Sequence, residues 1–329
     1  MKNAINFFNK YEKQKRIFNY DVAWKNVFIA MKEIDNSKAT LSAVVERILE
    51  SNSTYEGFIP KSLTTQVRNI DYGHFDRVPP PYRLNVLDGS YVSVTEELSS
   101  VRMYDTIADK IDSKVDCLVE FGSGLGINLA RMRMRLPDAK LCYIACEPSE
   151  NGRLAAKRMF SLDSKAELIT EYFDYLAPDL DFLKSYNKIV AFTCHSIEQI
   201  LVLGDEFYDQ LLNTNIHSCI HCEPVGWQRN SDIYNSVLNV VQSPELHQQF
   251  RQNYVYVLNN ENLLANAAAW AAMAWYNMDL LKVVSGAVER GDVTITDTAY
   301  DFVGSNPFNP STLISWVRNN KACSILFSQ

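Results

Sequence analysis

A short segment of the chain combines an acid with three closely spaced glycines. In VDCLVEFGSGLG, residues 115–126, a hydrophobic stretch leads into Glu120, and the glycines follow as Gly122, Gly124 and Gly126. Glycine has no Cβ atom, so a ligand can approach the backbone closely at these positions. The segment therefore predicts a buried strand, a turn that contacts a nucleotide-like ligand, and a helix whose N-terminus favours an anionic group.

The spacing of these glycines excludes two common nucleotide sites. A dinucleotide fingerprint requires G-x-G-x-x-G, whereas this turn reads G-x-G-x-G and Ile127 stands where the third glycine would be. The turn is not followed by the lysine of a phosphate-binding loop, which argues against a nucleoside triphosphate. What remains is a strand, an acid and a glycine turn that opens onto a helix.

Two further acids follow the next hydrophobic segments. Glu147 comes directly after LCYIAC and precedes Pro148, and Asp174 comes after LITEY and Phe173. In an open α/β sheet, ligands bind at the carboxyl ends of the strands. The sequence therefore predicts that Glu120, Glu147 and Asp174 end three successive strands and form one ligand-binding constellation.

The segment VEFGSGLG resembles motif I of the class I S-adenosylmethionine-dependent methyltransferases, a Rossmann-like family, and the chain resembles its small-molecule methyltransferases over about residues 102–303. The resemblance implies S-adenosyl-L-methionine as cofactor and S-adenosyl-L-homocysteine as product. It also implies that Glu120 binds the ammonium group, Glu147 the ribose hydroxyls and Asp174 the adenine amino group. The cofactor-binding residues that it implies are Arg102, Tyr104, Glu120, Gly122, Ser123, Gly124, Gly126, Glu147, Pro148, Phe173, Asp174, Thr193 and Cys194.

Arg102 and Tyr104 lie on an upstream helix that many enzymes of this family fold over the cofactor. The resemblance implies that Arg102 pairs with the methionine carboxylate in the bidentate manner that guanidinium prefers; the alternative is a surface arginine. Phe173, or one of the flanking Tyr172 and Tyr175, is expected to pack on the adenine ring.

The expected reacting side follows the fourth strand, in VAFTCHSIEQI. Family members that methylate exocyclic amines of bases carry an Asn/Asp-Pro-Pro-aromatic signature there, whereas this chain has Thr193, Cys194, His195 and Ser196. Methyl transfer is an in-line displacement that needs an aligned nucleophile and removal of its proton, and histidine titrates near neutral pH. His195 is therefore the candidate base, and Glu198 either orients it or is a first-turn helix acid.

A later strand, IHSCIHCE, supplies one more catalytic candidate. Glu223 ends this strand and is expected to contact the substrate. The same strand carries His217, Cys219 and His221 at alternate positions. Three residues on one central strand converge poorly on a tetrahedron, so we expect buried strand residues and no metal site.

The acceptor is expected to be a small polar molecule methylated on a hydroxyl group, such as a sugar or a secondary metabolite. Three alternatives stay open: N-methylation of a small molecule, methylation of a protein side chain, and a non-catalytic S-adenosylmethionine-binding protein on the same scaffold. Fold-level analogy identifies a cofactor rather than an acceptor. A homodimer is compatible with the sequence.

The composition is that of an ordinary soluble protein. The 329 residues carry a formal net charge of −7 and a sequence pI of about 5.4, a balance that does not favour nucleic acid or anionic lipid as partners. Seven cysteines without a C-x-x-C pair indicate a reducing, cytoplasmic setting. The alanine-rich residues 263–281 contain Asn266, Asn277 and Asp279, so we expect a buried or interface helix rather than a membrane span.

The elements that must position these residues alternate between strand and helix. Strands are expected at residues 115–121, 140–146, 167–173, 188–193 and 217–222, and helices at 93–111, 126–135, 150–160 and 205–212. This rhythm predicts an α/β fold with a doubly wound, mostly parallel, seven-stranded sheet. Residues 280–303 are expected to close the sheet with a late antiparallel hairpin around Gly291, before a loop and a last helix in residues 304–318.

Two regions are expected to lie outside this alternation. Residues 1–95 predict a mainly helical N-terminal cap that contributes to the substrate region, with helices over residues 21–34 and 40–51 and a proline-rich connector at 77–83. Residues 96–329 predict the methyltransferase domain, with a helical insertion around residues 231–278.

Overall fold

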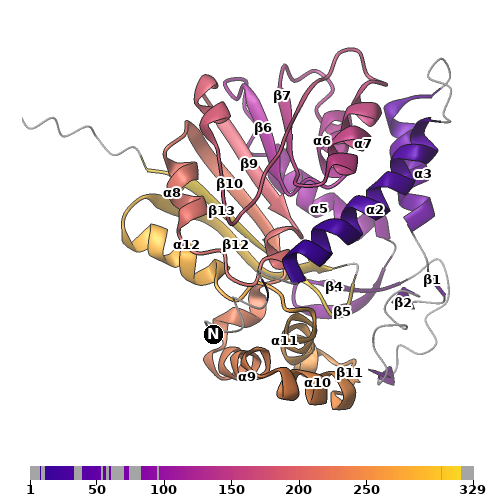
Figure 1. The fold of residues 1–329 in the computed structure, drawn as a ribbon, viewed down its shortest axis with the longest axis vertical. Coiled ribbons are helices and arrows are strands. Elements are labelled where there is room, and N and C mark those ends of the chain that lie inside the picture. The colour runs from indigo at the N-terminus through magenta and orange to yellow at the C-terminus, as the bar shows by residue number, and fades with distance from the viewer. Residues whose placement is uncertain are drawn as a thin grey trace, which may run out of the picture.

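The computed structural model contains one large sheet with helices against both of its faces (Figure 1). The strands of this sheet lie in the order β5-β4-β12-β13-β10-β9-β6-β7-β8. The structure describes residues 8, 12–32, 39–52, 55–56, 59–60, 70–73, 83–94, 96–304 and 306–319.

The parallel half of the sheet agrees with the strand and helix pattern predicted from the sequence. Its strands are β6 (Cys117–Phe121), β7 (Cys142–Cys146), β8 (Glu167–Glu171), β9 (Ile189–Cys194) and β10 (Ile216–Glu223). The helices between them are α6 (Ile127–Arg135), α7 (Glu150–Phe160) and α8 (Glu206–Leu212), with the 3₁₀ segments η3 (Asp181–Ser185) and η4 (Ile197–Gln199). All residues of β6 and β7 are buried, as expected for parallel strands covered on both faces.

The other half of the sheet is antiparallel and larger than predicted. Strand β13 (Ser311–Arg318) lies between β10 and β12 (Val293–Gly304) and runs antiparallel to both. Strand β12 then pairs with β4 (Arg83–Leu87), and β4 with β5 (Ser90–Val94). The sheet therefore has nine strands in the described residues instead of seven, because two strands come from the region predicted as a helical cap.

Two further predictions, both in residues 280–318, are wrong. The segment expected as the first hairpin strand forms helix α12 (Leu280–Glu289), which ends just before Gly291. The segment expected as the last helix forms β13. Helix α12 is amphipathic and packs its Val283, Val284 and Ala287 against the sheet, whereas β13 is buried on both faces and shows no alternation that would mark a strand.

Two helical layers cover the sheet. Figure 1 shows α8 and α12 on one side and α2 (Lys13–Lys32), α3 (Leu41–Asn52), α6 and α7 on the other. Helix α5 (Glu96–Ala108) joins the second layer, where Ile107 packs with Leu118 and Leu129 in one hydrophobic core. The core on the other face contains Phe207 of α8.

The N-terminal region contains two helices that overlap the predicted ones, together with short strands; α2 begins at residue 13, earlier than the predicted residue 21. The hydroxyl of Thr40 accepts a hydrogen bond from the backbone N–H of Ala43 at 3.3 Å, and so caps α3. The short strands are β1 (Tyr55–Glu56), β2 (Ile59–Pro60) and β3 (Ile70–Asp71). The proline-rich connector at residues 77–82 lies outside the described residues.

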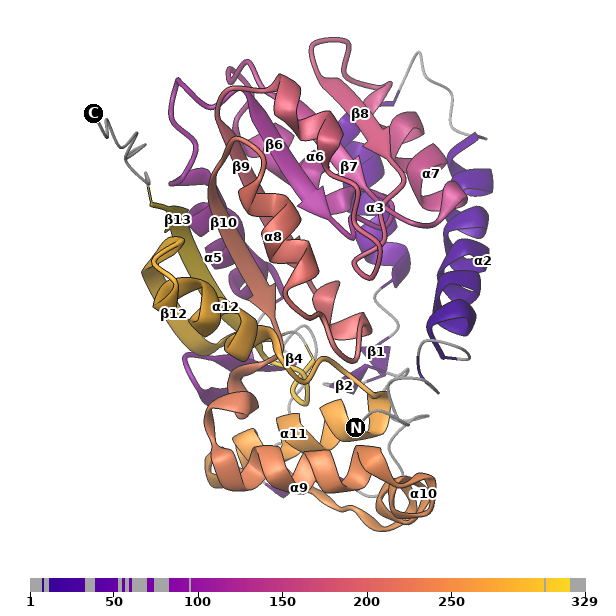
Figure 2. The ribbon, with the colours of Figure 1, turned by 60° about the vertical axis from the view of Figure 1, so that its left-hand side comes forward.

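The insertion after β10 is mainly helical. It comprises η5 (Gly226–Arg229), α9 (Ser231–Gln242), α10 (Pro244–Asn253), β11 (Tyr256–Val257), η6 (Asn260–Asn262) and α11 (Leu263–Ala274). These helices lie beyond the carboxyl ends of the parallel strands (Figure 2), and β11 pairs with β3. Within the described part of the chain, no helix is both long and apolar enough to cross a membrane.

Gly126 lies at the start of α6, in contact with α7, and a substitution there tests whether the turn requires glycine. Its φ is +77°, and an added Cβ would lie 2.9 Å from Cβ of Ala156. We expect Gly126→Ala to destabilise the protein by about 2–4 kcal/mol, from left-handed strain and overpacking together. Gly204→Ala is the matched control, because Gly204 has φ +69° but open space around it, so only about 1–2 kcal/mol of strain applies. If urea denaturation showed the same loss of unfolding free energy in both variants, the contribution of packing against Ala156 would be contradicted.

Candidate active site

A cavity of about 310 Å³ lies at the carboxyl ends of the parallel strands, where β6 and β9 run side by side. Strand order reverses between these two strands, and ligands of open α/β sheets bind at such a switch point. His195 lines the cavity. The predicted cofactor residues that also line it are Glu120, Gly122, Ser123, Gly124, Glu147, Pro148, Phe173, Asp174 and Cys194.

Glu120 presents a buried and half-satisfied carboxyl group to this cavity. Its Oε1 accepts a hydrogen bond from Nδ2 of Asn128 at 2.7 Å, but its Oε2 has no partner among the described residues. The buried hydroxyl of Ser123 also has none within that part of the chain. Burial raises the pKa of Glu120 to about 8. Leaving a buried polar atom unbonded is costly, so both atoms indicate a ligand that supplies hydrogen bonds or positive charge.

Tyr104 supports this arrangement from behind. Its hydroxyl donates to Oδ1 of Asn128 at 2.6 Å and accepts from Nη1 of Arg131 at 3.0 Å. Tyr104 does not line the cavity, so it acts on Glu120 through Asn128. The backbone of Arg102 belongs to α5, but its side chain lies outside the described residues.

The glycine turn approaches the loop after β9 more closely than any side chain would allow. Gly122 has φ +71°, and an added Cβ would lie 2.3 Å from Cβ of Ser196. The hydroxyl of Ser196 donates to the carbonyl of Phe121 at 2.8 Å. Gly126 lies outside the cavity lining, at the start of α6. The turn therefore joins the predicted cofactor side to the predicted reacting side.

Glu147 holds the glycine turn and the start of α7 together. Its Oε2 accepts a hydrogen bond from the backbone N–H of Gly124 at 2.8 Å, and its Oε1 accepts one from the N–H of Ser149 at 3.0 Å. Burial raises the pKa of Glu147 to about 7. Each carboxylate oxygen has a second lone pair, so Glu147 can still accept bonds from hydroxyl groups.

Asp174 lies at the far end of the cavity and is paired with a cation. Nζ of Lys13 lies 2.5 Å from its Oδ2, and the backbone N–H of Leu176 donates to its Oδ1 at 3.0 Å. Phe173 lines the cavity, but most of its ring packs in the core, 4.9 Å between centroids from Phe121. The end of the cavity predicted to hold adenine is thus lined by Asp174, the apolar Phe173 and Lys13.

Helix α2, part of the predicted N-terminal cap, forms a wall of the cavity with residues that were not among the predicted site residues. Asp21 fastens it to α7, since its Oδ1 accepts from the Ser149 hydroxyl at 2.7 Å and its Oδ2 from Nδ2 of Asn151 at 2.7 Å. Trp24 lies against the glycine turn, close to Gly124. The cavity residues that α2 contributes are Lys13, Arg16, Ile17, Tyr20 and Trp24.

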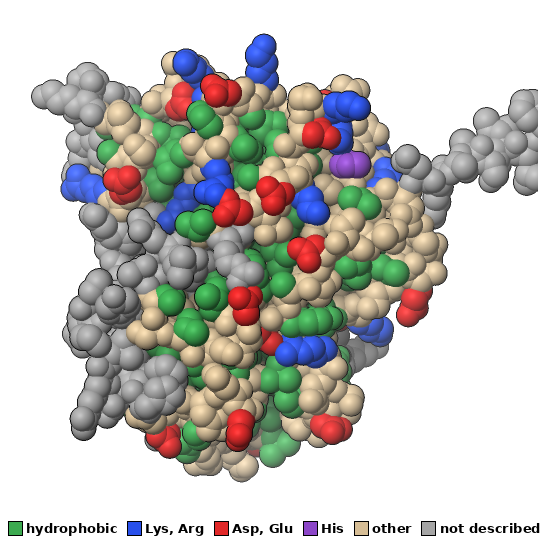
Figure 3. All heavy atoms as spheres, turned by 180° about the vertical axis from the view of Figure 1, so that it is seen from behind, with side chains coloured by type: hydrophobic (Ala, Val, Ile, Leu, Met, Phe, Trp, Pro, Cys, Tyr) green, Lys and Arg blue, Asp and Glu red, His purple; other side chains and the backbone are tan. Residues whose placement is uncertain are grey.

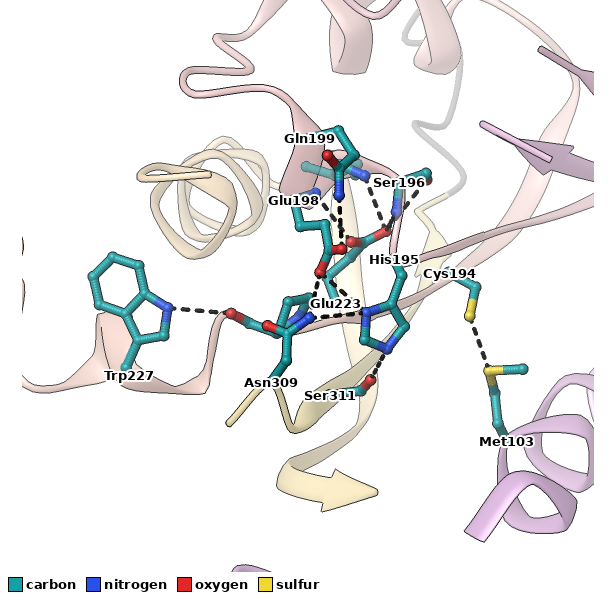
Figure 4. Close-up of polar contacts among 12 residues, drawn as sticks. Met103, Cys194, His195, Ser196, Glu198, Gln199, Glu223, Trp227, Asn309 and Ser311 are labelled. Atoms are coloured by element: carbon teal, nitrogen blue, oxygen red, sulfur yellow. Dashed lines mark hydrogen bonds and ion pairs between the residues drawn. The ribbon is translucent and has the colours of Figure 1, made fainter. Parts of the chain in front are cut away.

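At the reacting end, His195 is held at both ring nitrogens (Figure 4). Its Nδ1 lies 3.0 Å from Oε2 of Glu198, and its Nε2 lies 2.7 Å from the hydroxyl of Ser311. Nδ2 of Asn309 donates to the same Glu198 oxygen at 3.0 Å. The φ of His195 is +52°, a strained value for a residue with a side chain. Glu198 thus bonds to His195 and also lies in the first turn of η4, so both features that the sequence offered as alternatives are present, although Glu198 itself does not line the cavity.

This geometry sets the charge of His195. Burial lowers its pKa, but the charge and hydrogen bond of Glu198 raise it more, and the resulting pKa is about 9. In the ligand-free protein at neutral pH, the ring is therefore an imidazolium paired with Glu198.

Glu223 was predicted to contact the substrate, but it does not line the cavity. Its Oε1 accepts the backbone N–H groups of Ser196 and Ile197, both at 3.2 Å, and its Oε2 accepts that of Glu198 at 3.1 Å. Through these bonds, the carboxylate fixes the loop that carries His195. Glu223 is therefore a positioning residue.

Thr193 and His221 belong to a buried cluster behind the site. The hydroxyl of Thr193 lies 3.1 Å from Nδ1 of His221, whose Nε2 lies 2.6 Å from the hydroxyl of Tyr208. Burial lowers the pKa of His221 to about 3, so the ring is neutral. Within the described residues, His, Cys, Asp and Glu form no group of three arranged to hold a metal ion.

Among known proteins, only solved structures match the chain. No protein-family model matches the chain, and no curated protein matches it. The ribosomal protein L11 methylase of Lactobacillus delbrueckii subsp. bulgaricus is 12% identical, over 69% of this chain and 81% of that one, with a TM-score of 0.37. The magnesium protoporphyrin IX methyltransferase of Synechocystis PCC 6803, with bound S-adenosylhomocysteine, is 11% identical over 68% and 84%, with a TM-score of 0.39.

A third similar structure is the geranyl diphosphate C-methyltransferase of Streptomyces coelicolor A3(2), which holds Mg²⁺, geranyl diphosphate and S-adenosyl-L-homocysteine. It is 9% identical, over 67% of this chain and 80% of that one, with a TM-score of 0.39. These three structures are methyltransferases. Their TM-scores below 0.5 decide neither reaction nor acceptor, which must be inferred from the chain's own residues.

The pairing of His195 with Glu198 predicts a measurable titration. Glu198→Gln removes the charge that raises the pKa of His195 and leaves the burial that lowers it. We expect the pKa of His195 to fall from about 9 toward the ordinary value of 6.5, with Glu223 still raising it, and the ring protons follow this titration by NMR. Glu206→Gln, an exposed acid on α8, is the control and should change little. An unchanged titration in Glu198→Gln would contradict the assigned pair.

Proposed function

We propose that the chain is a class I S-adenosylmethionine-dependent methyltransferase that methylates a hydroxyl group of a small polar molecule. One observation carries the proposal. The buried Oε2 of Glu120 and the hydroxyl of Ser123, which have no hydrogen-bond partner among the described residues, lie beside a glycine turn in a cavity at the strand switch point. An ammonium group is the ligand part that would satisfy a buried carboxylate oxygen best.

The other cavity residues fit the remaining parts of this cofactor. The N-terminus of α6 follows the glycine turn and suits a carboxylate. Glu147 has lone pairs for ribose hydroxyls, and Asp174 beside Phe173 suits an amino-bearing aromatic ring. Bound there, the cofactor would supply an electrophilic methyl group on a good leaving group.

His195 is the proposed base for the acceptor hydroxyl. Neutral His195 that donates Nδ1–H to Glu198 has its lone pair on Nε2, 2.7 Å from the hydroxyl of Ser311. Nε2 takes the acceptor proton directly or through that hydroxyl. A cationic sulfonium in the same cavity disfavours the imidazolium by like-charge repulsion, so cofactor binding lowers the pKa of His195 and produces the base.

The surface of the protein is compatible with a small-molecule acceptor. Basic and acidic side chains are interspersed on the face in Figure 3, and the net charge of −7 gives nucleic acid no general attraction. An amine acceptor is the nearest alternative and needs no base, because its neutral form already has a lone pair. A non-catalytic binding protein is the second alternative, and it would keep cofactor affinity without turnover.

Cofactor binding tests the proposal first. Calorimetric titration with S-adenosylmethionine and S-adenosylhomocysteine should show binding to the wild-type protein. Glu120→Gln should bind at least about tenfold more weakly, about 1.4 kcal/mol, because it loses the charge opposite the ammonium group. Gly124→Arg, which fills the turn beside Trp24, should not bind. A folded wild-type protein that binds neither compound would refute the proposal.

The pH dependence of turnover tests the role of His195. With a base of pKa about 9 in the free protein, only about one molecule in a hundred is neutral at pH 7. For a hydroxyl acceptor, kcat/KM for S-adenosylmethionine, which reports the cofactor-free enzyme, should therefore rise about tenfold per pH unit and level off near pH 9. His195→Ala should lower kcat by about 10²–10⁴ and abolish this rise. An unchanged kcat in His195→Ala would favour an amine acceptor instead.

A further inference from the structure

Arg16 brings a positive charge into the cavity without a carboxylate partner. It projects from α2 and lines the cavity together with His195 and Gln199. Among the described residues, no carboxylate oxygen lies within ion-pair distance of its guanidinium, although Lys13 on the same helix is paired with Asp174. Burial lowers the pKa of Arg16. Buried charges in proteins are normally paired, so this arginine requires an explanation.

Among the described residues, Arg16 donates hydrogen bonds only to neutral acceptors. Its Nη1 donates to the carbonyl of Gln199 at 3.0 Å and more weakly to Oε1 of that residue at 3.4 Å. Its Nη2 donates to the carbonyl of Ala274, at the end of α11, and its guanidinium lies 4.9 Å from the centre of the Phe8 ring. A guanidinium has five N–H donors, so Nε–H and one Nη2–H have no acceptor in the described part of the chain. Such donors can bind a carboxylate or a phosphate.

Glu198, one of the acids whose charge acts on Arg16, has both carboxylate oxygens hydrogen-bonded to other groups. Oε2 of Glu198 bonds His195 and Asn309, and its Oε1 accepts from Nε2 of Gln199 at 2.8 Å. In the ligand-free protein, Arg16 and His195 are two cationic groups that line the reacting end of the cavity.

The contacts of Arg16 place it on the acceptor side. Gln199 follows His195 in the loop after β9, and Ala274 belongs to the helical insertion. The methionine part of the cofactor instead has Glu120, Ser123 and the N-terminus of α6. We infer that Arg16 binds an anionic group of the methyl acceptor, a carboxylate or a phosphate, so that the substrate is a small hydroxy acid or phosphate ester. This inference rests on the proposed methyl transfer.

Anion binding to the cofactor-saturated protein tests the inference without knowledge of the acceptor. The protein is saturated with S-adenosylhomocysteine and titrated calorimetrically with inorganic phosphate and, separately, with acetate. We expect one saturable site for at least one of these anions. Arg16→Gln should weaken that site at least tenfold and leave the affinity for S-adenosylhomocysteine within about twofold of wild type. Arg16→Lys, which keeps the charge but not the planar guanidinium, should give an intermediate loss of anion affinity.

Lys15→Gln is the matched control, because it removes the same charge from an exposed position on α2, and it should bind the anion like wild type. Wild-type protein without an anion site would overturn the inference, as would equal anion binding by Arg16→Gln. Loss of S-adenosylhomocysteine affinity in Arg16→Gln with anion binding retained would assign Arg16 to the cofactor and also overturn it. If S-adenosylhomocysteine does not bind wild type, the proposed function fails, and the same titrations on the ligand-free protein still decide whether Arg16 binds anions.

Discussion

The carboxylate of Glu223 fixes the loop on which both halves of the cavity depend. It accepts three successive backbone N–H groups, those of Ser196, Ile197 and Glu198, at the end of β9 (Figure 4). The loop held in this way places Ser196 against Gly122 and gives His195 its positive φ. Burial raises the pKa of Glu223 to about 7, so the bonds to these donors offset a substantial desolvation cost. One buried acid therefore links the glycine turn to the reacting end.

The parallel half of the fold could be predicted from the sequence because most of its strands are hydrophobic runs that end at an acid or a polar turn. The runs of β6, β7 and β9 mark buried strands, and the helices that follow β6 and β7 are amphipathic. The residues at the ends of β6, β7 and β8 therefore come together as expected around the cavity. Glu120 and Glu147 were found in this way because a charged residue directly after a buried run is conspicuous.

The remaining parts depend on contacts between distant segments, which local patterns do not report. Strand β13 is buried on both faces between β10 and β12, so STLISWVR lacks the alternation of a half-exposed strand. The role of α2 depends on Asp21 reaching α7, more than 120 residues away. Arg16 carried no sequence signal beyond a basic residue on a predicted cap, because its significance lies in the absence of a carboxylate beside it in the described residues.

The contact between Trp24 and the glycine turn gives the protein an internal optical reporter. Of the five tryptophans, Trp24 alone lines the cavity, and its ring stacks on Tyr20 with 5.9 Å between centroids. Trp227, Trp270, Trp275 and Trp316 do not line the cavity. Indole emission depends on the polarity and the stacking partners of the ring, so we expect ligand addition to change the emission of Trp24. Occupancy of the cavity can thus be followed in the unlabelled protein, before any substrate is known.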